Sequence, residues 1–519
     1  SAMAPAPSMF MSVPAWVVIA GIGVEGFWRA VRRRPGGTVR AGTQFAVWAM
    51  RPWLWWGLFN LVFSWRWQNG FNNLRTFPFF ANLWEETESW GQALHRIGQA
   101  PGVVVWGGAV LAVLAALVGW LAWVLWRTPR RIWPALASLY VLTVALHLSL
   151  ACLPNGAWTG GGRAGSLLSA WHAHATMLYT VPFVKDSDDY LRRFREIQPQ
   201  LRSTIHGLSH PPGASLSLYW IGNALGARGL DIRQPETRLR YTLGLTLFGA
   251  LNVVIIFLLA RGLFDARTGF LAALLWATAP SVSIYATFAQ DAVYAVFFNL
   301  ALLLAWHTVT AVRRPAGFAL GLGATFFALA LLNYSWCILA TIFAIFALWT
   351  GRRARWTPGV YALRVGLPLA TMALLGGVFL AHYRLDYWAI YRFSRQYVDL
   401  WYPFTGPYQW LMALIGGQLD LLLLLGSVTC AAFVAATVNF RKLDFREPRV
   451  IYLAVLLGVF ALPLLFGPNC LKMETARCWN WIATLPLAFA AAQLLRMPDR
   501  LFAVGAPVVS VLTCAGLRL

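Results

Sequence analysis

Charged residues are scarce in this chain. Asp, Glu, Lys and Arg make up 12% of its 519 residues, whereas a soluble globular domain carries roughly 25%. Hydrophobic residues make up 59%, and apolar runs of about 20 residues recur, the length that a helix needs to cross a hydrocarbon core. The composition therefore excludes a soluble globule and predicts an all-α polytopic membrane protein with about 12–14 transmembrane helices.

Acidic residues are the rarer of the two signs of charge. The chain has 19 Asp and Glu against 42 Lys and Arg, for a net charge of +23. Such an excess could indicate a nucleic-acid partner, but many of the arginines lie in short connectors between apolar runs. The positive-inside rule accounts for that distribution, and attraction to anionic lipid strengthens it. We therefore expect membrane lipids, and no nucleic acid, among the partners.

Cysteine is also sparse, and none of the six occurs in a C-x-x-C or zinc-finger spacing. Four lie inside or at the ends of apolar runs, where we expect them to be small core residues. They are Cys152, Cys337, Cys430 and Cys514. Cys470 and Cys478 share one loop, and they could form a disulfide if that loop faces an oxidising compartment.

The apolar runs predict about 14 helices. They lie near 9–28, 46–64, 103–126, 132–152, 242–264, 268–288, 292–312, 316–334, 336–350, 361–382, 408–437, 450–466, 480–495 and 501–518. The pieces between them are too short for a separate soluble domain, so each is expected to be a loop. No internal repeat is visible.

The short connectors rich in arginine all fall on one side of the predicted bundle. They are 127–131, 261–267, 313–314, 352–355, 441–449 and 496–500. The positive-inside rule makes this side cytoplasmic. The long connectors 65–102, 153–241, 383–407 and 467–479 then all face the extracytoplasmic side. The largest of them, 153–241, is too long for a simple turn.

That largest connector contains an acidic cluster, "DSDDYLRRFREI", with Asp186, Asp188 and Asp189. Acidic residues followed by arginines are typical of the start of a helix. A carboxylate in an external cleft can act as a general base, and three of them could hold a divalent ion. The same residues could instead only solvate the loop and favour the helix N-terminus.

The same connector carries "SHPPG", in which His210 precedes two prolines. A residue before proline is held extended, so its ring is projected from the chain. Imidazole can donate a hydrogen bond to phosphate or take a proton, although the motif could also be only a turn. Proline can open a helix, and the apolar spacing after it predicts one that lies along the membrane surface.

Further candidates lie at the ends of other apolar runs. Asp291 precedes the run 292–312, where an ionisable residue is costly and usually lines a cavity. The loop "CLKMETARC" holds Lys472, Glu474 and Arg477, of which the last suits bidentate binding of phosphate. Arg384 lies among aromatic residues, in a mixture that fits sugar stacking or lipid headgroups.

The order of these features resembles polyprenyl-phosphate-dependent glycosyltransferases of the GT-C fold. It is most similar to the bacterial branch related to protein O-mannosyltransferases and lipid A aminoarabinose transferases. The residues that carry the resemblance are Asp186 and Tyr190, His210 of "SHPPG", Asp291 and "ETAR" at 474–477. The family often has Asp-Glu at its catalytic position, whereas Ser187 follows Asp186 here, so Asp188 and Asp189 stay candidates.

The resemblance implies transfer of a sugar from a lipid-linked donor to an acceptor hydroxyl, typically with inversion. Asp186 would be the general base, and His210 would lie near the donor phosphate. Cations would neutralise the departing phosphate. The matching candidates are Arg384, Lys472 and Arg477, with Tyr190, Asp291 and Glu474 in supporting roles. This role for the carboxylate needs no metal, although a divalent ion could bind there.

The resemblance also implies an organisation and a location. Residues 132–495 would form the catalytic core, preceded by an extension, 1–131, and followed by a last helix in 496–519. The protein would lie in the bacterial cytoplasmic membrane with its site on the periplasmic side. The acceptor could be a lipid, a glycan or a protein. A flippase of lipid-linked sugars and a polymerase or ligase of polyprenyl-diphosphate glycans are the alternatives.

Overall fold

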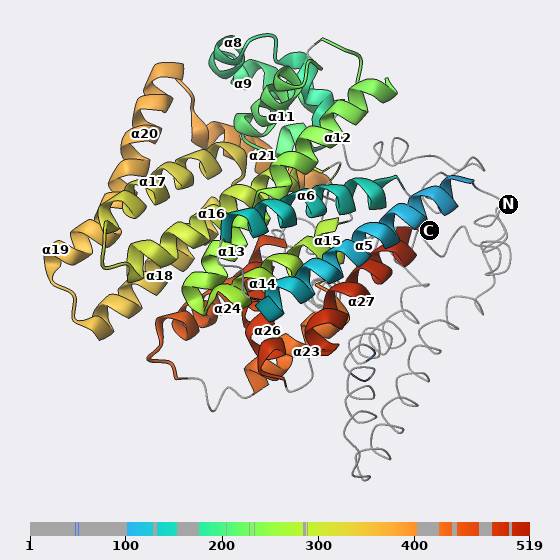
Figure 1. Ribbon diagram of the computed structural model, residues 1–519. Helices are drawn as coiled ribbons and strands as arrows, with labels where there is room; N and C mark the ends of the chain where they lie inside the picture. The colour runs from blue at the N-terminus through green and yellow to red at the C-terminus, as the bar shows by residue number, and fades with distance from the viewer. Residues whose placement is uncertain are drawn as a thin grey trace, which may run out of the picture.

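A computed structural model shows the arrangement of the helices (Figure 1). The residues that it describes are 47, 50, 101–127, 132–152, 176–203, 205–227, 229–232, 234–283, 287, 289–401, 425–438, 444–466, 480–497 and 501–518. Every regular element in these ranges is a helix.

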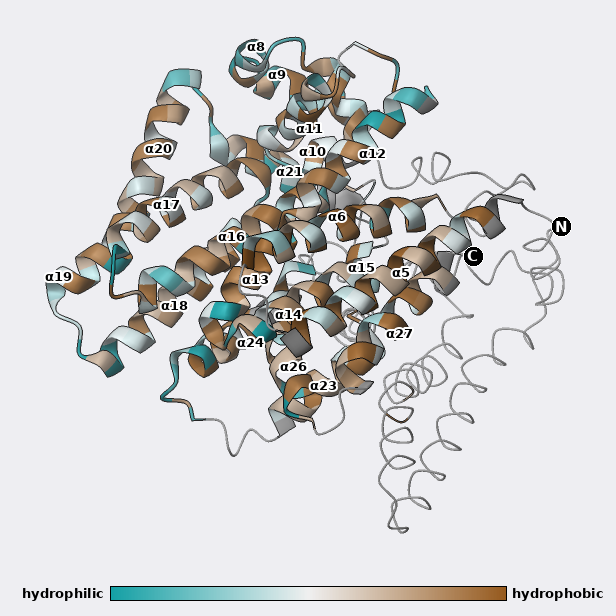
Figure 2. Cartoon of the chain, viewed as in Figure 1, coloured by the Kyte–Doolittle hydropathy of each residue, from teal (hydrophilic) through white to brown (hydrophobic). Residues whose placement is uncertain are grey.

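Seven helical segments are long and apolar enough to cross a membrane. They are Val105–Leu125, Ile132–Ala151, Glu236–Leu263, Asp291–Thr310, Pro315–Leu332, Trp336–Ala354 and Pro358–Tyr383. Shorter apolar helices accompany them at Ser427–Thr437, Pro448–Val459 and Phe502–Ala515. The chain is thus an all-α, multi-pass membrane protein, as predicted. Figure 2 shows the apolar character along these helices and hydrophilic residues at their ends.

The helices pack in a layered bundle. Their bounds are α5 Pro101–Arg127, α6 Ile132–Ala151, α12 Pro235–Ala250, α13 Asn252–Leu263, α14 Ala266–Thr278, α15 Pro280–Ser283, α16 Asp291–Thr310, α17 Pro315–Leu332, α18 Trp336–Ala354, α19 Pro358–Tyr361, η3 Ala362–Gly366, α20 Leu367–Tyr383, α21 Tyr387–Trp401, α23 Ser427–Val438, α24 Pro448–Phe466, η6 Asn480–Ala483, α26 Thr484–Arg496 and α27 Leu501–Arg518. At the centre, α14 packs on α13, α26, α27 and α5. At the edge, α20 packs mainly on α17.

Burial separates the centre of the bundle from its edge. In the apolar window of α16, 72% of the residues are buried inside protein, against 6% for the segment that ends with α20. An apolar helix in a membrane need not be buried by protein, because lipid tails are as apolar as the leucine side chains that would otherwise cover it. The same argument explains Cys337, which was expected in the core but is exposed on α18. Cys430 and Cys514 are buried as expected, and Cys152 is half-buried.

Two predicted helices are interrupted. The run 268–288 was expected to be one helix, but α14 ends at Thr278 because Pro280 follows. Proline lacks an N–H and pushes the preceding residue into extended backbone, as Ala279 shows with φ −60° and ψ 128°. The run 408–437 is interrupted before α23 by Gly426, whose φ of 98° is a conformation that favours glycine.

Other predicted elements differ from the structure in their bounds or type, or lie outside the described residues. The span expected at 242–264 begins earlier, at Glu236. The connector 383–407 was expected to be a loop, but it contains α21. The predicted helices 9–28 and 46–64, apart from single residues of the second, lie outside the described residues, as do Cys470 and Cys478.

The connectors gather at two ends of the bundle, with α8 and α9 at one end and α19 at the other (Figure 1). At the arginine-rich end, Arg449 Nη1 donates to the carbonyl of Leu263 (3.5 Å), which joins two of the short connectors. At the other end, Gln198 Nε2 donates to Ser394 Oγ (3.0 Å), which joins the long connectors 153–241 and 383–407. The long connectors that are described thus meet, as the sequence predicts.

A buried polar chain crosses the interior of the bundle. Asn299 Nδ2 donates to Asn252 Oδ1 (2.8 Å), and Thr484 Oγ1 donates to Asn299 Oδ1 (2.7 Å). Asn252 Nδ2 in turn donates to the carbonyl of Gly249 (2.9 Å). All three side chains are buried. Buried polar groups are costly unless they are paired. These hydrogen bonds therefore fix the positions of α13, α16 and α26 relative to one another.

Asn299→Ala should lower the free energy of unfolding by about 1 kcal/mol or more, because it leaves partners on two other helices without hydrogen bonds. Unfolding of the purified protein in detergent, followed by tryptophan fluorescence, measures the change. Thr310→Val is the matched control, since within the described residues its hydroxyl bonds only to the Trp306 carbonyl of its own helix (2.8 Å). Equal stability of the two variants would contradict the linking role.

Candidate active site

The described part of the connector 153–241 includes a compact group of short helices at one end of the bundle (Figure 1). We call this group, residues 176–224, the loop module. Its elements are η1 Thr176–Phe183, α8 Ser187–Arg192, α9 Phe194–Ile197, η2 Gln198–Ser203, α10 Ile205–Ser209 and α11 Pro212–Ala224. It has a small core of its own. The core includes Val184, Tyr190, Leu191, Phe194, Leu208, Leu216, Tyr219 and, from α21, Ile390.

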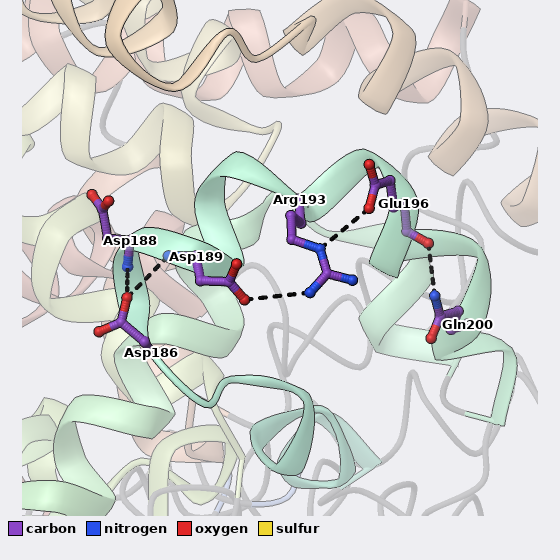
Figure 3. A network of polar contacts seen from close by, with 6 residues as sticks. All are labelled: Asp186, Asp188, Asp189, Arg193, Glu196 and Gln200. Carbon is purple, nitrogen blue, oxygen red and sulfur yellow. Dashed lines mark hydrogen bonds and ion pairs between the residues drawn. The ribbon is translucent and has the colours of Figure 1, made fainter.

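Asp186 is the N-cap of α8. Its backbone is extended, with φ −141° and ψ 143°, and its Oδ2 accepts hydrogen bonds from the backbone N–H groups of Asp188 (2.9 Å) and Asp189 (3.0 Å). Figure 3 shows these two bonds on one carboxylate oxygen. In the part of the chain that the structure describes, Oδ1 carries no hydrogen bond. The side chain is exposed, so capping fixes the orientation of a carboxylate that a solute can still reach.

The other two aspartates of the cluster pair with arginines of the same helix turn. Asp188 Oδ2 lies 3.0 Å from Arg192 Nε, and Asp189 Oδ2 lies 3.6 Å from Arg193 Nη1. Arg193 also pairs with Glu196 (3.2 Å), and Figure 3 shows this pair beside the Asp189–Arg193 pair. The Asp188–Arg192 and Asp189–Arg193 pairs have the i,i+4 spacing of ion pairs on a helix surface, which stabilise a helix modestly.

Asp188 has a second neighbourhood on another part of the chain. Arg192 Nη2 lies 3.3 Å from His382 Nε2, and the Arg192 guanidinium lies over the Tyr383 ring, 5.6 Å from its centroid. Arg192 and then the Tyr383 hydroxyl lower the pKa of the Asp188 carboxyl below its ordinary value. Arg192 of the same helix thus favours the charged form of Asp188, and Tyr383 at the end of α20 adds to this effect.

The helix α11 holds the turn around Asp186 by two hydrogen bonds. Tyr219 Oη donates to the Lys185 carbonyl (3.4 Å), and Trp220 Nε1 donates to Ser187 Oγ (3.2 Å). These two bonds flank Asp186 on both sides in sequence. Earlier in α11, Ser215 Oγ accepts a hydrogen bond from Thr180 of η1 (2.7 Å). Over its first two turns α11 is enclosed by protein, which differs from the predicted helix along the membrane surface.

His210 lies between α10 and α11, as the Pro-Pro motif predicts. Its ring stacks on Tyr294, with centroids 5.7 Å apart and an interplanar angle of 20°, and its Nδ1 lies 3.0 Å from Ser209 Oγ. Tyr294 is one helical turn after Asp291, the first residue of α16. The structure thus brings His210 to the turn of α16 that begins with Asp291.

Gly213, the last residue of the "HPPG" motif, lies where α11 contacts α17. A Cβ at this position would lie 2.6 Å from the Leu331 carbonyl oxygen of α17. Only glycine therefore allows α11 to approach α17 this closely. Since His210 precedes α11 and the Asp186 turn rests on its later residues, this contact positions both motifs.

The predicted site residues fall into separate groups. From Pro212 to Trp220, α11 advances by about 12 Å along its axis, so His210 and the Asp186 turn lie toward opposite ends of α11. Tyr190 is buried in the small core, where desolvation raises the pKa of its hydroxyl. Arg384 is exposed, has φ 52°, and directly follows Tyr383.

The structure does not describe the positions of three predicted site residues. Lys472, Glu474 and Arg477 lie outside the described residues. Among the residues that are described, no three His, Cys, Asp or Glu side chains are grouped as metal ligands would be. The cavities found in this part of the chain lie elsewhere; the one of about 500 Å³ is lined by Phe264, Arg267 and Arg496 at the arginine-rich end.

Four residues that contact the site were not predicted from the sequence. They are His382, Tyr383, Trp220 and Tyr294. His382 and Tyr383 stand beside Arg384, which was chosen for its aromatic surroundings, so the composition of that connector contained the information. Nothing local marks which residue of another segment they meet.

Comparison with known families gives an independent result. Residues 227–375 match the family model described as dolichyl-phosphate-mannose-protein mannosyltransferase. This region runs from the connector before α12 into α20, so it includes Asp291 and ends before His382. The match supports a membrane glycosyltransferase of the GT-C superfamily that uses a lipid-linked sugar donor. The search of curated proteins finds no match.

Gly213→Ala should destabilise the loop module, because the added methyl group forces α11 away from α17. Overpacking of this kind costs about 1–3 kcal/mol. Thermal unfolding in detergent measures it. Gly317→Ala in α17 is the matched control, because a Cβ there meets nothing within 4 Å and alanine favours a helix. A Gly213→Ala variant as stable as the control would show that α11 can shift without cost.

Proposed function

We propose that this protein transfers a sugar from a polyprenyl-phosphate donor to an acceptor hydroxyl, with Asp186 as the general base. The observation that carries the proposal is the Asp186 carboxylate. Two backbone N–H groups hold its Oδ2, the residue is exposed, and Oδ1 carries no hydrogen bond in the described part of the chain. A base must be fixed in orientation and open to its substrate. The family match of residues 227–375 supports the reaction class.

In this mechanism, Asp186 Oδ1 takes the proton of the acceptor hydroxyl as the acceptor oxygen attacks the anomeric carbon. The bond between that carbon and the phosphate oxygen breaks, and the phosphate leaves with the bonding electrons. Attack opposite the leaving group inverts the anomeric centre. Asp188 and Asp189 are poorer candidates for the base, because Arg192 and Arg193 engage their carboxylates.

The remaining polar residues would act on the donor. His210 would donate a hydrogen bond to its phosphate, with Asp291 nearby at the start of α16. Arg384, Lys472 and Arg477 would neutralise charge on the leaving phosphate. Glu474 would orient Arg477, and Tyr190 would hold α8 in its small core. The base and the donor phosphate would then occupy the two ends of α11.

The proposal extends to the cellular setting. The end of the bundle with the loop module would face the periplasm of a bacterium, and the arginine-rich end would face the cytoplasm. Residues 132–495 would be the catalytic core. The donor tail would lie in the bilayer, and the acceptor would be a lipid, glycan or protein that reaches the outer face.

Asp186→Asn tests the base. Asparagine is as good an N-cap as aspartate, so α8 keeps its cap while the carboxylate is lost. We expect kcat to fall by about 100-fold or more, the usual range for a general base. The assay is transfer of label from polyprenyl-phosphate sugars to membrane extract by purified protein in lipid. Glu196→Gln, which removes an exposed acid of the same module, should keep full activity.

Full activity of Asp186→Asn would move the base to Asp188 or Asp189. If the wild-type protein transfers no sugar from any donor in this assay, the proposed function itself is wrong.

His210→Ala tests the donor contact. Loss of one hydrogen bond to a charged group should raise the KM for the donor about tenfold. Steady-state rates at varied donor concentration measure this change. His210→Gln keeps a donor N–H and should restore part of the affinity. An unchanged KM in both variants would make the motif a structural turn only.

A further inference from the structure

The end of α20 contacts the helix that carries the proposed base. Arg192 of α8 lies 3.3 Å from His382 Nε2 and over the Tyr383 ring. The two α20 residues also hold each other, with ring centroids 4.7 Å apart at an interplanar angle of 87°. The Tyr383 hydroxyl faces Asp188, which pairs with Arg192. Four side chains from two segments thus form one contact, which we call the α8–α20 clasp.

A second contact places α21 on the same module. Gln198 Nε2 donates to the Ile390 carbonyl (3.4 Å) and to Ser394 Oγ (3.0 Å). Ile390 is buried in the small core beside Tyr190. The turn between α20 and α21 is therefore attached to the loop module on both of its sides.

The neighbouring ion pair shows that the clasp is more than a feature of the helix surface. Arg193 and Asp189 form the same type of i,i+4 pair one residue further along. Among the described residues, this second pair contacts only Glu196 of α9 in addition. An exposed pair of this kind contributes little alone. What distinguishes Arg192 and Asp188 is that they reach α20.

The clasp acts on the least enclosed helix of the bundle. Protein buries 6% of the apolar window of the segment that ends at Tyr383. Its last residues contact α17, the clasp and the small core of the loop module, against which Phe379 and Tyr383 pack. Asp186 caps α8 through the N–H groups of Asp188 and Asp189. Any tilt of α8 therefore turns the Asp186 carboxylate.

We infer that His382 and Tyr383 are positioning residues that hold α8, and through it the Asp186 carboxylate, in the orientation needed for proton transfer. They act through Arg192 and Asp188 and do not contact the reacting atoms. This inference rests on the proposed function. It assigns Asp188 a role different from that of Asp186, and it gives the start of the connector 383–407 a part in the reaction.

The test combines a kinetic and a structural measurement on the full-length protein in lipid. The variants are His382→Ala and Tyr383→Phe, with Arg193→Gln as the matched control. We expect kcat to fall about tenfold, because a small misplacement of a reacting group is costly, while the KM for the donor stays within about twofold. Hydrogen exchange of the amides of residues 188 and 189 should become faster. His382→Gln, which keeps an acceptor atom for Arg192, should restore both values.

The outcomes separate the inference from the proposed function. Unchanged amide exchange in His382→Ala and Tyr383→Phe would show that the clasp does not hold α8. Faster exchange with unchanged kcat would show that the position of α8 does not matter for transfer. Either result overturns the inference and leaves the proposed function standing. Absence of transfer by the wild-type protein overturns the proposed function and the positioning role together, whatever the exchange shows.

Discussion

The close approach of α11 to α17 sets the positions of His210 and of the turn that carries Asp186. Gly213 leaves no room for a Cβ against the Leu331 carbonyl, so α11 has one place to lie. From that place, its N-terminal end presents His210 to the first turn of α16. Its later residues hold the turn on either side of Asp186 by two hydrogen bonds. One buried helix therefore fixes two motifs that the chain separates by more than 20 residues.

Three aspartates within four residues have three different environments. Asp186 precedes the helix, so its carboxylate turns back onto the free N–H groups of the first turn. Asp188 points toward α20 and is held charged by Arg192 and Tyr383. Asp189 pairs within its own helix. Position relative to the helix start, and not residue type, thus decides which carboxylate binds backbone N–H groups and which ones pair with arginine.

The sequence predicted the parts of this structure that depend on local chemistry. Apolar length identified the spans, acids followed by arginines identified the start of α8, and two prolines identified the break at His210. The errors at Pro280 and Gly426 came from treating an apolar run as a continuous helix, although proline and glycine marked both breaks. The contact of Arg192 with His382 could not be predicted, since it joins residues 190 positions apart and neither has a distinctive local pattern.

The matched region and the loop module divide the work of the proposed reaction. The family model covers 227–375, which is mostly membrane-spanning helix, whereas Asp186 and His210 precede it. A donor with a lipid tail needs apolar helices beside a polar end. The acceptor needs a carboxylate that stays exposed until substrate covers it and excludes water, when its charge acts most strongly. The matched region contains the apolar helices. The module contains the carboxylates, which remain exposed while its apolar side chains form a core against the bundle.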